Sequence, residues 1–237
     1  MTKDKKRFFV ERRDPDFPFY DEEENFGKRE ILILSTGILL FVFWTLQKFI
    51  KVPDIVRSLV YFFLALIPFL IVSKGKMSAL IKKPRFYDIV LVIGGGTVLF
   101  IASLMVAIRL GSIGIVDLET ISANPATQME HDTLFMIGFL FQIFGEEMFK
   151  IDVFLVVLTL MYRSTGKRRL SVLVGMLVSS IIFGALHYNA YGNLLFVICV
   201  QGLTSGMIAM YLYLRTKNIM VPYFAHLLLD IIALLSA

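Results

Sequence analysis

A charged stretch inside a long apolar run constrains this chain more than any other feature. The run extends from Thr133 to Tyr162, and as an α-helix it is long enough to cross a bilayer. Near its middle it carries Glu146, Glu147, Lys150 and Asp152. Because Asp and Lys near the centre of a membrane helix each cost roughly 2.5 to 3.5 kcal/mol, a helix that only anchored the chain would not carry these groups. We therefore expect a functional site inside the membrane, with partners on neighbouring helices.

The composition places the chain among membrane proteins. Of its 237 residues, 57% are hydrophobic and 18% are charged, and the mean hydropathy is +0.74. The net charge of +5 comes from Lys and Arg beside apolar segments, which indicates anchoring at a lipid bilayer and no binding of nucleic acid. The single cysteine, Cys199, excludes an intrachain disulfide framework and a cysteine-based zinc site.

Seven segments are long and apolar enough to span a bilayer as helices. They comprise residues 31–50, 55–72, 87–108, 133–162, 170–187, 192–214 and 220–235. A triple glycine at 94–96 interrupts the third segment, and small residues in the fifth and sixth indicate close helix packing. The sequence thus predicts an all-α, polytopic transmembrane bundle over residues 31–237. A polar tail, residues 1–30, precedes it and lacks the apolar region of a signal peptide.

The distribution of basic residues predicts the orientation in the membrane. Lys and Arg gather in the tail and in residues 74–85, 163–169 and 215–217, whereas the charged residues of the 111–132 loop are all acidic. The positive-inside rule then places the N-terminus in the cytoplasm and the C-terminus outside. The 48–54 turn does not follow the rule, because this orientation places it outside although it contains two lysines. Aromatic residues in the tail leave two interpretations open, a tail lying at the headgroups and a docking segment for a protein partner.

Two histidines inside predicted spans are the natural partners for the acidic pair. Phe183 and His187 lie four residues apart, as do His226 and Asp230, so each couple shares one face of a helix. The Asp230 carboxylate could accept the imidazole N–H of His226 and fix its tautomer. Taken singly, a histidine at the end of a span is more often interfacial than catalytic. The third histidine, His131, falls in the acidic loop.

These residues give the chain a resemblance to the CPBP intramembrane proteases, which include type II CAAX prenyl endopeptidases and bacterial Abi or bacteriocin self-immunity proteins. The family motif E-E-x-x-x-R matches at Glu146 and Glu147, F-x-x-x-H ends at His187, and H-x-x-x-(N/D) begins at His226. The similarity covers about residue 133 to the C-terminus. The family arginine, however, would fall at Ile151. Lys150 precedes it and points about 100° away on an ideal helix.

The resemblance implies an intramembrane endopeptidase in a bacterial cell membrane that cuts a membrane-bound peptide or protein near the cytoplasmic leaflet. Glu146 and His187 would activate a water, and Glu147 would hold the geometry, with Lys150 as its cation. The oxyanion side would consist of His226 and Asp230. The family chemistry needs no cofactor. Zinc ranks second, because Glu and His are competent ligands but H-E-x-x-H is absent.

Three alternatives remain at this stage. Glu146 could form an internal ion pair with Lys150, four residues on, and the charged stretch would then be structural. The missing arginine favours a non-catalytic scaffold or immunity partner that retains the fold. A transporter could use the same acids and histidines as a relay, although the sequence shows no two related halves. One geometric difficulty also stands: in straight helices His226 would lie roughly 10 Å and His187 roughly 25 Å from the cytoplasmic ends.

Overall fold

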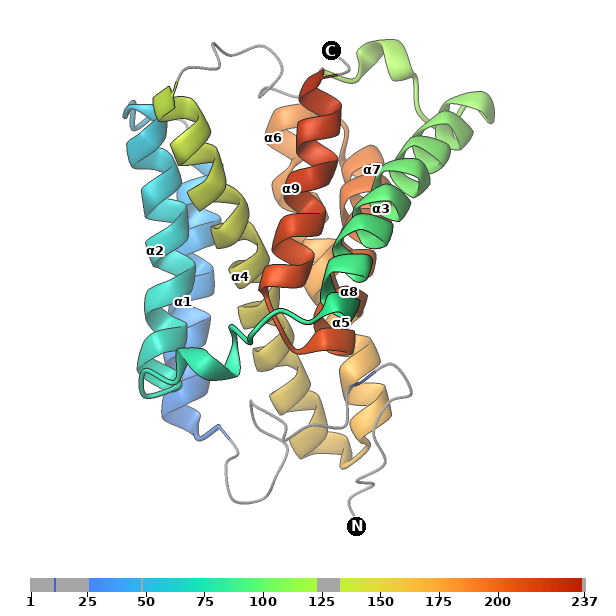
Figure 1. Cartoon of the computed structure of the whole chain (residues 1–237). Helices are drawn as coiled ribbons and strands as arrows, with labels where there is room; N and C mark the ends of the chain where they lie inside the picture. Colours follow the sequence, from blue (N-terminus) through green and yellow to red (C-terminus); the bar gives the residue numbers. More distant parts are fainter. Residues whose placement is uncertain (1–10, 12–25, 48, 123–132, 236–237) are drawn as a thin grey trace.

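The computed structural model describes residues 11, 26–47, 49–122 and 133–235, and its regular elements in these ranges are helices (Figure 1). The long helices are α1 (Lys28–Leu46), α2 (Asp54–Val72), α3 (Phe86–Ser112), α4 (Thr133–Thr165) and α5 (Arg168–Leu186). The remainder comprises α6 (Tyr188–Tyr191), α7 (Leu194–Val197), the π-helical η4 (Ile198–Gly206), α8 (Met207–Thr216) and α9 (Met220–Leu235). Two single turns, η1 (Met77–Ala79) and η2 (Leu118–Thr120), flank α3.

The predicted all-α membrane bundle is confirmed. Within the described ranges, five helical segments have the length and apolarity to cross a membrane: α1, α2, α3, α5 continued through α6, and the α7–η4–α8 unit. The short helix α9 is also apolar, with 16 residues. Helix α4 has 33 residues and therefore the required length, but the charged stretch interrupts its apolar run. These seven rods correspond to the seven segments expected from the sequence.

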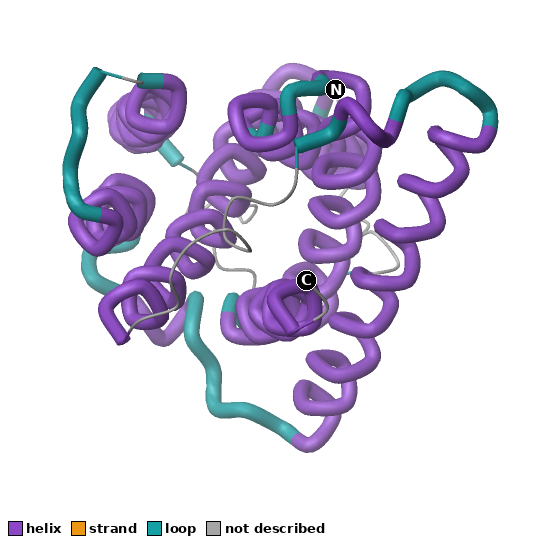
Figure 2. The backbone as a smooth tube through the Cα atoms, turned by 90° about the horizontal axis from the view of Figure 1, so that it is seen from above, coloured by secondary structure: helices purple, strands orange, loops and turns teal. Residues whose placement is uncertain are grey.

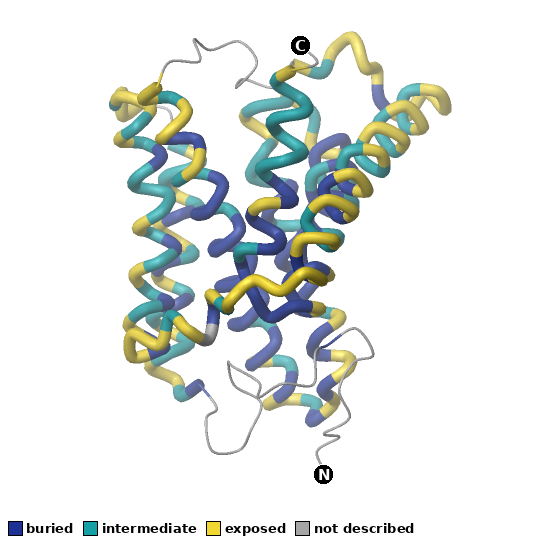
Figure 3. The backbone as a smooth tube through the Cα atoms, in the orientation of Figure 1, coloured by how far each residue is buried: buried dark blue, intermediate teal, exposed yellow. Residues whose placement is uncertain are grey.

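Helix α4 is the centre of the bundle. It packs against α2 on one side and against α5 on the other, while α1 lies on α2, and α3 covers α9 and η4 (Figures 1 and 2). Most of α4 beyond Gly138 is buried, whereas α1, α2 and α3 carry large exposed apolar side chains such as Phe43, Ile67 and Met105 (Figure 3). An apolar exterior suits contact with lipid, and it leaves α4 as the element enclosed by protein.

Glycines allow α5 and η4 to approach each other closely. A Cβ atom on Gly184 would lie 2.7 Å from the Cα of Gly202, and one on Gly202 would lie 2.8 Å from the carbonyl oxygen of Ser180. This is the small-residue packing expected from the sequence. Helix α3 continues through the three glycines at 94–96, and a Cβ atom on Gly95 or Gly96 would lie 2.7 Å or 2.8 Å from a leucine side chain of α8 or α9.

The turn between α8 and α9 lies inside the molecule. Lys217, Asn218 and Ile219 are at most 3% exposed. The Asn218 side chain accepts a hydrogen bond from the Lys82 backbone N–H at 3.3 Å and donates one to its carbonyl at 3.2 Å. In Figure 1, α4 and α5 extend well beyond this turn. Helix α9 therefore begins partway up the bundle, so His226 lies farther from the basic end than the sequence predicted for straight helices. This position lets His226 line the same cavity as His187.

Candidate active site

The two adjacent acids of α4 point toward different partners. Successive residues of an α-helix lie about 100° apart around its axis, so Glu146 and Glu147 cannot face the same neighbour. Glu147 is 2% exposed and turns toward α9. Glu146 is half-buried and lines a cavity, where the Gln142 side-chain amide donates a 3.0 Å hydrogen bond to its Oε1 atom.

Glu147 is the hub of a buried polar network. Its Oε1 atom accepts hydrogen bonds from Lys150 Nζ at 2.6 Å and from His226 Nδ1 at 2.7 Å. On the other side of the imidazole, His226 Nε2 lies 3.5 Å from Oδ2 of Asp230. Basic and acidic groups thus alternate along the chain Lys150–Glu147–His226–Asp230. This alternation compensates buried charges that would each be costly alone.

Lys150 supplies the cation of this network. It is 1% exposed, its Nζ atom lies 4.2 Å from the centroid of the Phe183 ring, and its backbone carbonyl accepts a 2.6 Å hydrogen bond from Ser179. Its ion pair is with Glu147, three residues earlier, so the pair with Glu146 considered from the sequence is wrong. Ile151, at the position of the family arginine, is 1% exposed and belongs to the apolar core.

His187 ends α5 with a defined tautomer. Its Nδ1 atom lies 2.9 Å from the carbonyl oxygen of Phe183. A carbonyl only accepts, so Nδ1 must carry the hydrogen, and the neutral ring keeps a lone pair on Nε2. Phe183 also meets the His187 ring edge-on, with centroids 4.6 Å apart. These contacts orient an imidazole that can take a proton from a water in the adjacent cavity.

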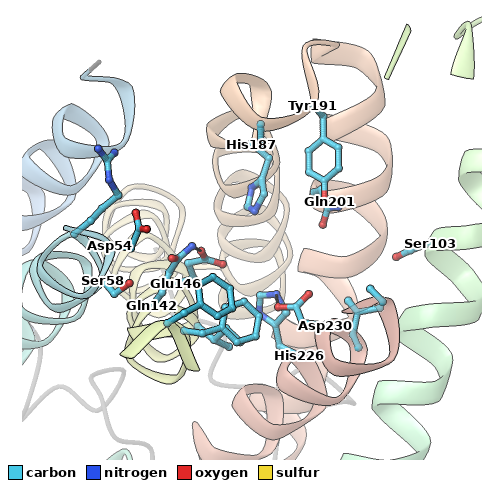
Figure 4. Close-up of a pocket in the computed structure, with 17 residues that line it drawn as sticks. Asp54, Ser58, Ser103, Gln142, Glu146, His187, Tyr191, Gln201, His226 and Asp230 are labelled. Carbon is cyan, nitrogen blue, oxygen red and sulfur yellow. Dashed lines mark hydrogen bonds and ion pairs between the residues drawn. The ribbon is translucent and has the colours of Figure 1, made fainter. Parts of the chain in front are cut away.

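Two cavities flank the Glu146–His187 pair. The larger, judged by the number of residues that line it, holds about 300 Å³ and is bounded by α2, α3, α4, α9, the α5–α6 end and η4 (Figure 4). The second, also of about 300 Å³, lies between α1, α2, α4 and the end of α5. Residues lining both are Arg57, Gln142, Glu146, His187 and Ala190. The acid and the histidine therefore stand where two water-accessible spaces meet.

The structure brings the predicted site residues together. Glu146, His187, His226 and Asp230 line the larger cavity, Phe183 lines the second, and Glu147 and Lys150 lie directly behind His226. Asp152 lines neither cavity, and its Oδ1 atom accepts no hydrogen bond from the described residues. His131 lies outside the described residues.

Sequence reasoning missed several polar residues of the cavity walls, among them Arg57, Gln142, Tyr191 and Gln201. Gln142 carried a usable signal, since it stands one helical turn before Glu146 in an apolar run. Arg57 could also have been noticed, because it is a charged residue near the start of an apolar segment. Tyr191 and Gln201, whose side chains lie 3.3 Å apart, had no comparable pattern. In the described part of the chain, no three His, Cys, Asp or Glu side chains are arranged to hold a metal ion.

Fold and site together define a polytopic helical membrane protein with a buried acid–histidine centre beside a polar cavity. Residues 132–232 match the family model described as type II CAAX prenyl endopeptidase Rce1-like. This region holds α4 to α8, α9 as far as Ile232 and all three motifs, so over these residues the chain is similar to that protease family. Comparisons with curated proteins and with solved structures gave no match.

Proposed function

We propose that this protein is an intramembrane endopeptidase that hydrolyses a peptide bond in a membrane-associated peptide or protein. The observation that carries the proposal is the meeting of Glu146 and His187 at the junction of two cavities. A hydrolase needs a base beside a space that admits both water and the bond to be cut. It also needs room on either side of that bond, which the two cavities supply.

In the proposed reaction, Glu146 and His187 activate one water molecule. Gln142 holds Oε1 of Glu146 and leaves its other carboxylate oxygen for the water, while Nε2 of His187 offers a lone pair. The water oxygen attacks the carbonyl carbon as one of its protons passes to one of these two bases. That proton then moves to the amide nitrogen as the C–N bond breaks, and the products are an amine and a carboxylic acid, which holds the second proton of the water until it ionises.

His226 and Asp230 form the opposite wall, where the oxyanion would develop. With Nδ1–H donated to Glu147, the imidazole presents Nε2 toward Asp230 and the cavity. A protonated Nε2 can donate to the tetrahedral intermediate, and carboxylates at both nitrogens suit that form. Glu147 and Lys150 act as positioning residues, because they touch His226 or one another and line neither cavity.

The test compares the membrane peptidome of cells carrying wild-type protein with that of cells carrying Glu146→Gln or His187→Ala. We expect a precursor to accumulate in both variants, since each removes a base without removing a packed apolar side chain. Glu119→Gln, an exposed acid in η2, is the matched control and should process the precursor normally.

An unchanged peptidome in both site variants would refute the catalytic assignment. It would favour the non-catalytic scaffold, for which the buried Ile151 in place of an arginine is the motivating observation. Equal amounts of folded protein, measured by gel filtration in detergent, must accompany either result.

A further inference from the structure

We propose that the substrate enters the site from the membrane face opposite the basic loops, so that the segment cut is one exposed on the non-cytoplasmic side. This inference rests on the proposed function and specifies which segment of a membrane peptide can be a substrate. It differs from the sequence-based expectation of cleavage near the cytoplasmic leaflet.

The cavities occupy one end of the bundle. The described lining residues of α4 run from Phe135 to Glu146, and those of α9 run from His226 to Ala233. On α2 they run from Asp54 to Tyr61. The start of α4, the end of α9 and the start of α2 all lie at the end of the molecule that carries the C-terminus (Figure 1). The larger cavity therefore extends from the acid–histidine centre to that face.

Packed side chains close the opposite direction. Immediately beyond Glu146 on α4, Met148, Phe149 and Ile151 are each at most 1% exposed. On α9, the residues before His226 are buried at Val221 and Ala225, and the recessed 217–219 turn lies beneath them. Among the described residues, neither cavity has a lining residue on α4 after Glu146 or on α9 before His226. Figure 3 shows the buried backbone gathered in the middle of the bundle, with buried and exposed positions mixed at its lower end.

The charges identify which face is which. The end away from the cavities carries most of the basic residues, namely Lys28, Arg29, Lys74, Lys76, Lys82, Lys83, Arg85, Arg163, Lys167, Arg168, Arg169, Arg215 and Lys217. At the cavity end, the described basic residues are Lys51, Arg57 and Arg109, beside Asp54, Asp117 and Glu119. By the positive-inside rule the basic end faces the cytoplasm, so the cavity faces away from it.

The proposal predicts which substrates are cut. A peptide bond that lies on the cytoplasmic side would have to cross the packed half of the bundle to meet Glu146. A bond in an exported segment, or in the outer-leaflet end of a membrane-spanning segment, reaches the site directly through the larger cavity.

Cysteine accessibility tests the direction without requiring activity. In a Cys199→Ser background, Ala233→Cys places a thiol near the cavity mouth and Ala190→Cys places one where the two cavities meet. Ser164→Cys, an exposed position in the last turn of α4, is the control at the basic end. Each full-length variant is treated with a charged, membrane-impermeant methanethiosulfonate reagent, in spheroplasts and in inside-out vesicles.

We expect Ala233→Cys and Ala190→Cys to react faster in spheroplasts, and Ser164→Cys to react faster in inside-out vesicles. Reaction of all three after denaturation confirms that the thiols are present. The proposal is overturned if Ala190→Cys reacts faster in inside-out vesicles, if it reacts in neither preparation, or if Ser164→Cys reacts from outside. None of these outcomes depends on proteolysis, so a catalytically inactive protein would still give a decisive result.

Discussion

Replacing Lys150, the buried cation of the site, should lower the stability of the protein, because the buried carboxylate of Glu147 then loses its ion-pair partner. Lys150 is 1% exposed and its Nζ atom lies 2.6 Å from Glu147 Oε1. At that distance, an effective dielectric constant of about 20 gives an attraction of about 6 kcal/mol. Most of it offsets the desolvation of the two charges. The substitution Lys150→Met keeps the length of the side chain but leaves Glu147 without its ammonium partner.

We expect Lys150→Met to lower the free energy of unfolding by about 3 kcal/mol, the lower end of the range for breaking a buried ion pair. The lower end applies because His226 Nδ1 still donates to the same carboxylate oxygen at 2.7 Å. Adding Glu147→Gln should recover most of that stability, since the acid left behind is then neutral. Such recovery is the signature of direct coupling in a double-mutant cycle.

The assay is chemical unfolding of the purified protein in detergent, followed by tryptophan fluorescence. Lys167→Met, an exposed lysine before α5, is the matched control and should change stability by about 0.5 kcal/mol or less. If Lys150→Met costs no more than this control, or if Glu147→Gln adds to its effect, the buried pair does not stabilise the fold and our electrostatic account of the site is wrong.

Three further experiments test other parts of the structure. The double substitution Lys150→Ile and Ile151→Arg restores the family motif in the sequence but places a guanidinium in the apolar core. We therefore expect the variant to misfold, as measured by gel filtration, and a folded, active variant would contradict this. Gly184→Ala should lower the free energy of unfolding by about 1 to 3 kcal/mol, because its Cβ atom would lie 2.7 Å from a neighbouring backbone. Gly94→Ala should leave the stability unchanged, because nothing lies within 4 Å of its Cβ position, and equal effects of the two substitutions would refute the close packing. Asp230→Asn keeps an acceptor for the imidazole and should retain cleavage, while Asp230→Leu should lose about 10- to 100-fold, and equal activities would remove Asp230 from the site.

The helices were predictable because each rests on a local property, length and apolarity along one segment. The convergence of His187, His226 and the acidic pair was also predictable, since ionisable groups inside an apolar bundle must find one another. The sequence left the partner of Lys150 open between Glu146 and Glu147, because i,i+3 and i,i+4 neighbours are both within reach on a helix and only tertiary packing selects Glu147. The position of α9 along the bundle axis could not be predicted, because it depends on hydrogen bonds between Asn218 and Lys82, which lie 136 residues apart.

The structure explains why α4 keeps three of the four charged side chains between residues 146 and 152, and Asp152 is the exception. Asp152 lies in the packed half of α4, and its Oδ1 atom accepts no hydrogen bond from the described residues, so the cost of its burial is not offset there. Glu147 and Lys150 neutralise each other and hold His226, and Glu146 faces a cavity that admits water. One acid is thus buried against an imidazole, and its neighbour lines a cavity, as the proposed activation of water requires. A helix rotation of about 100° per residue is what lets two consecutive glutamates have these opposite environments.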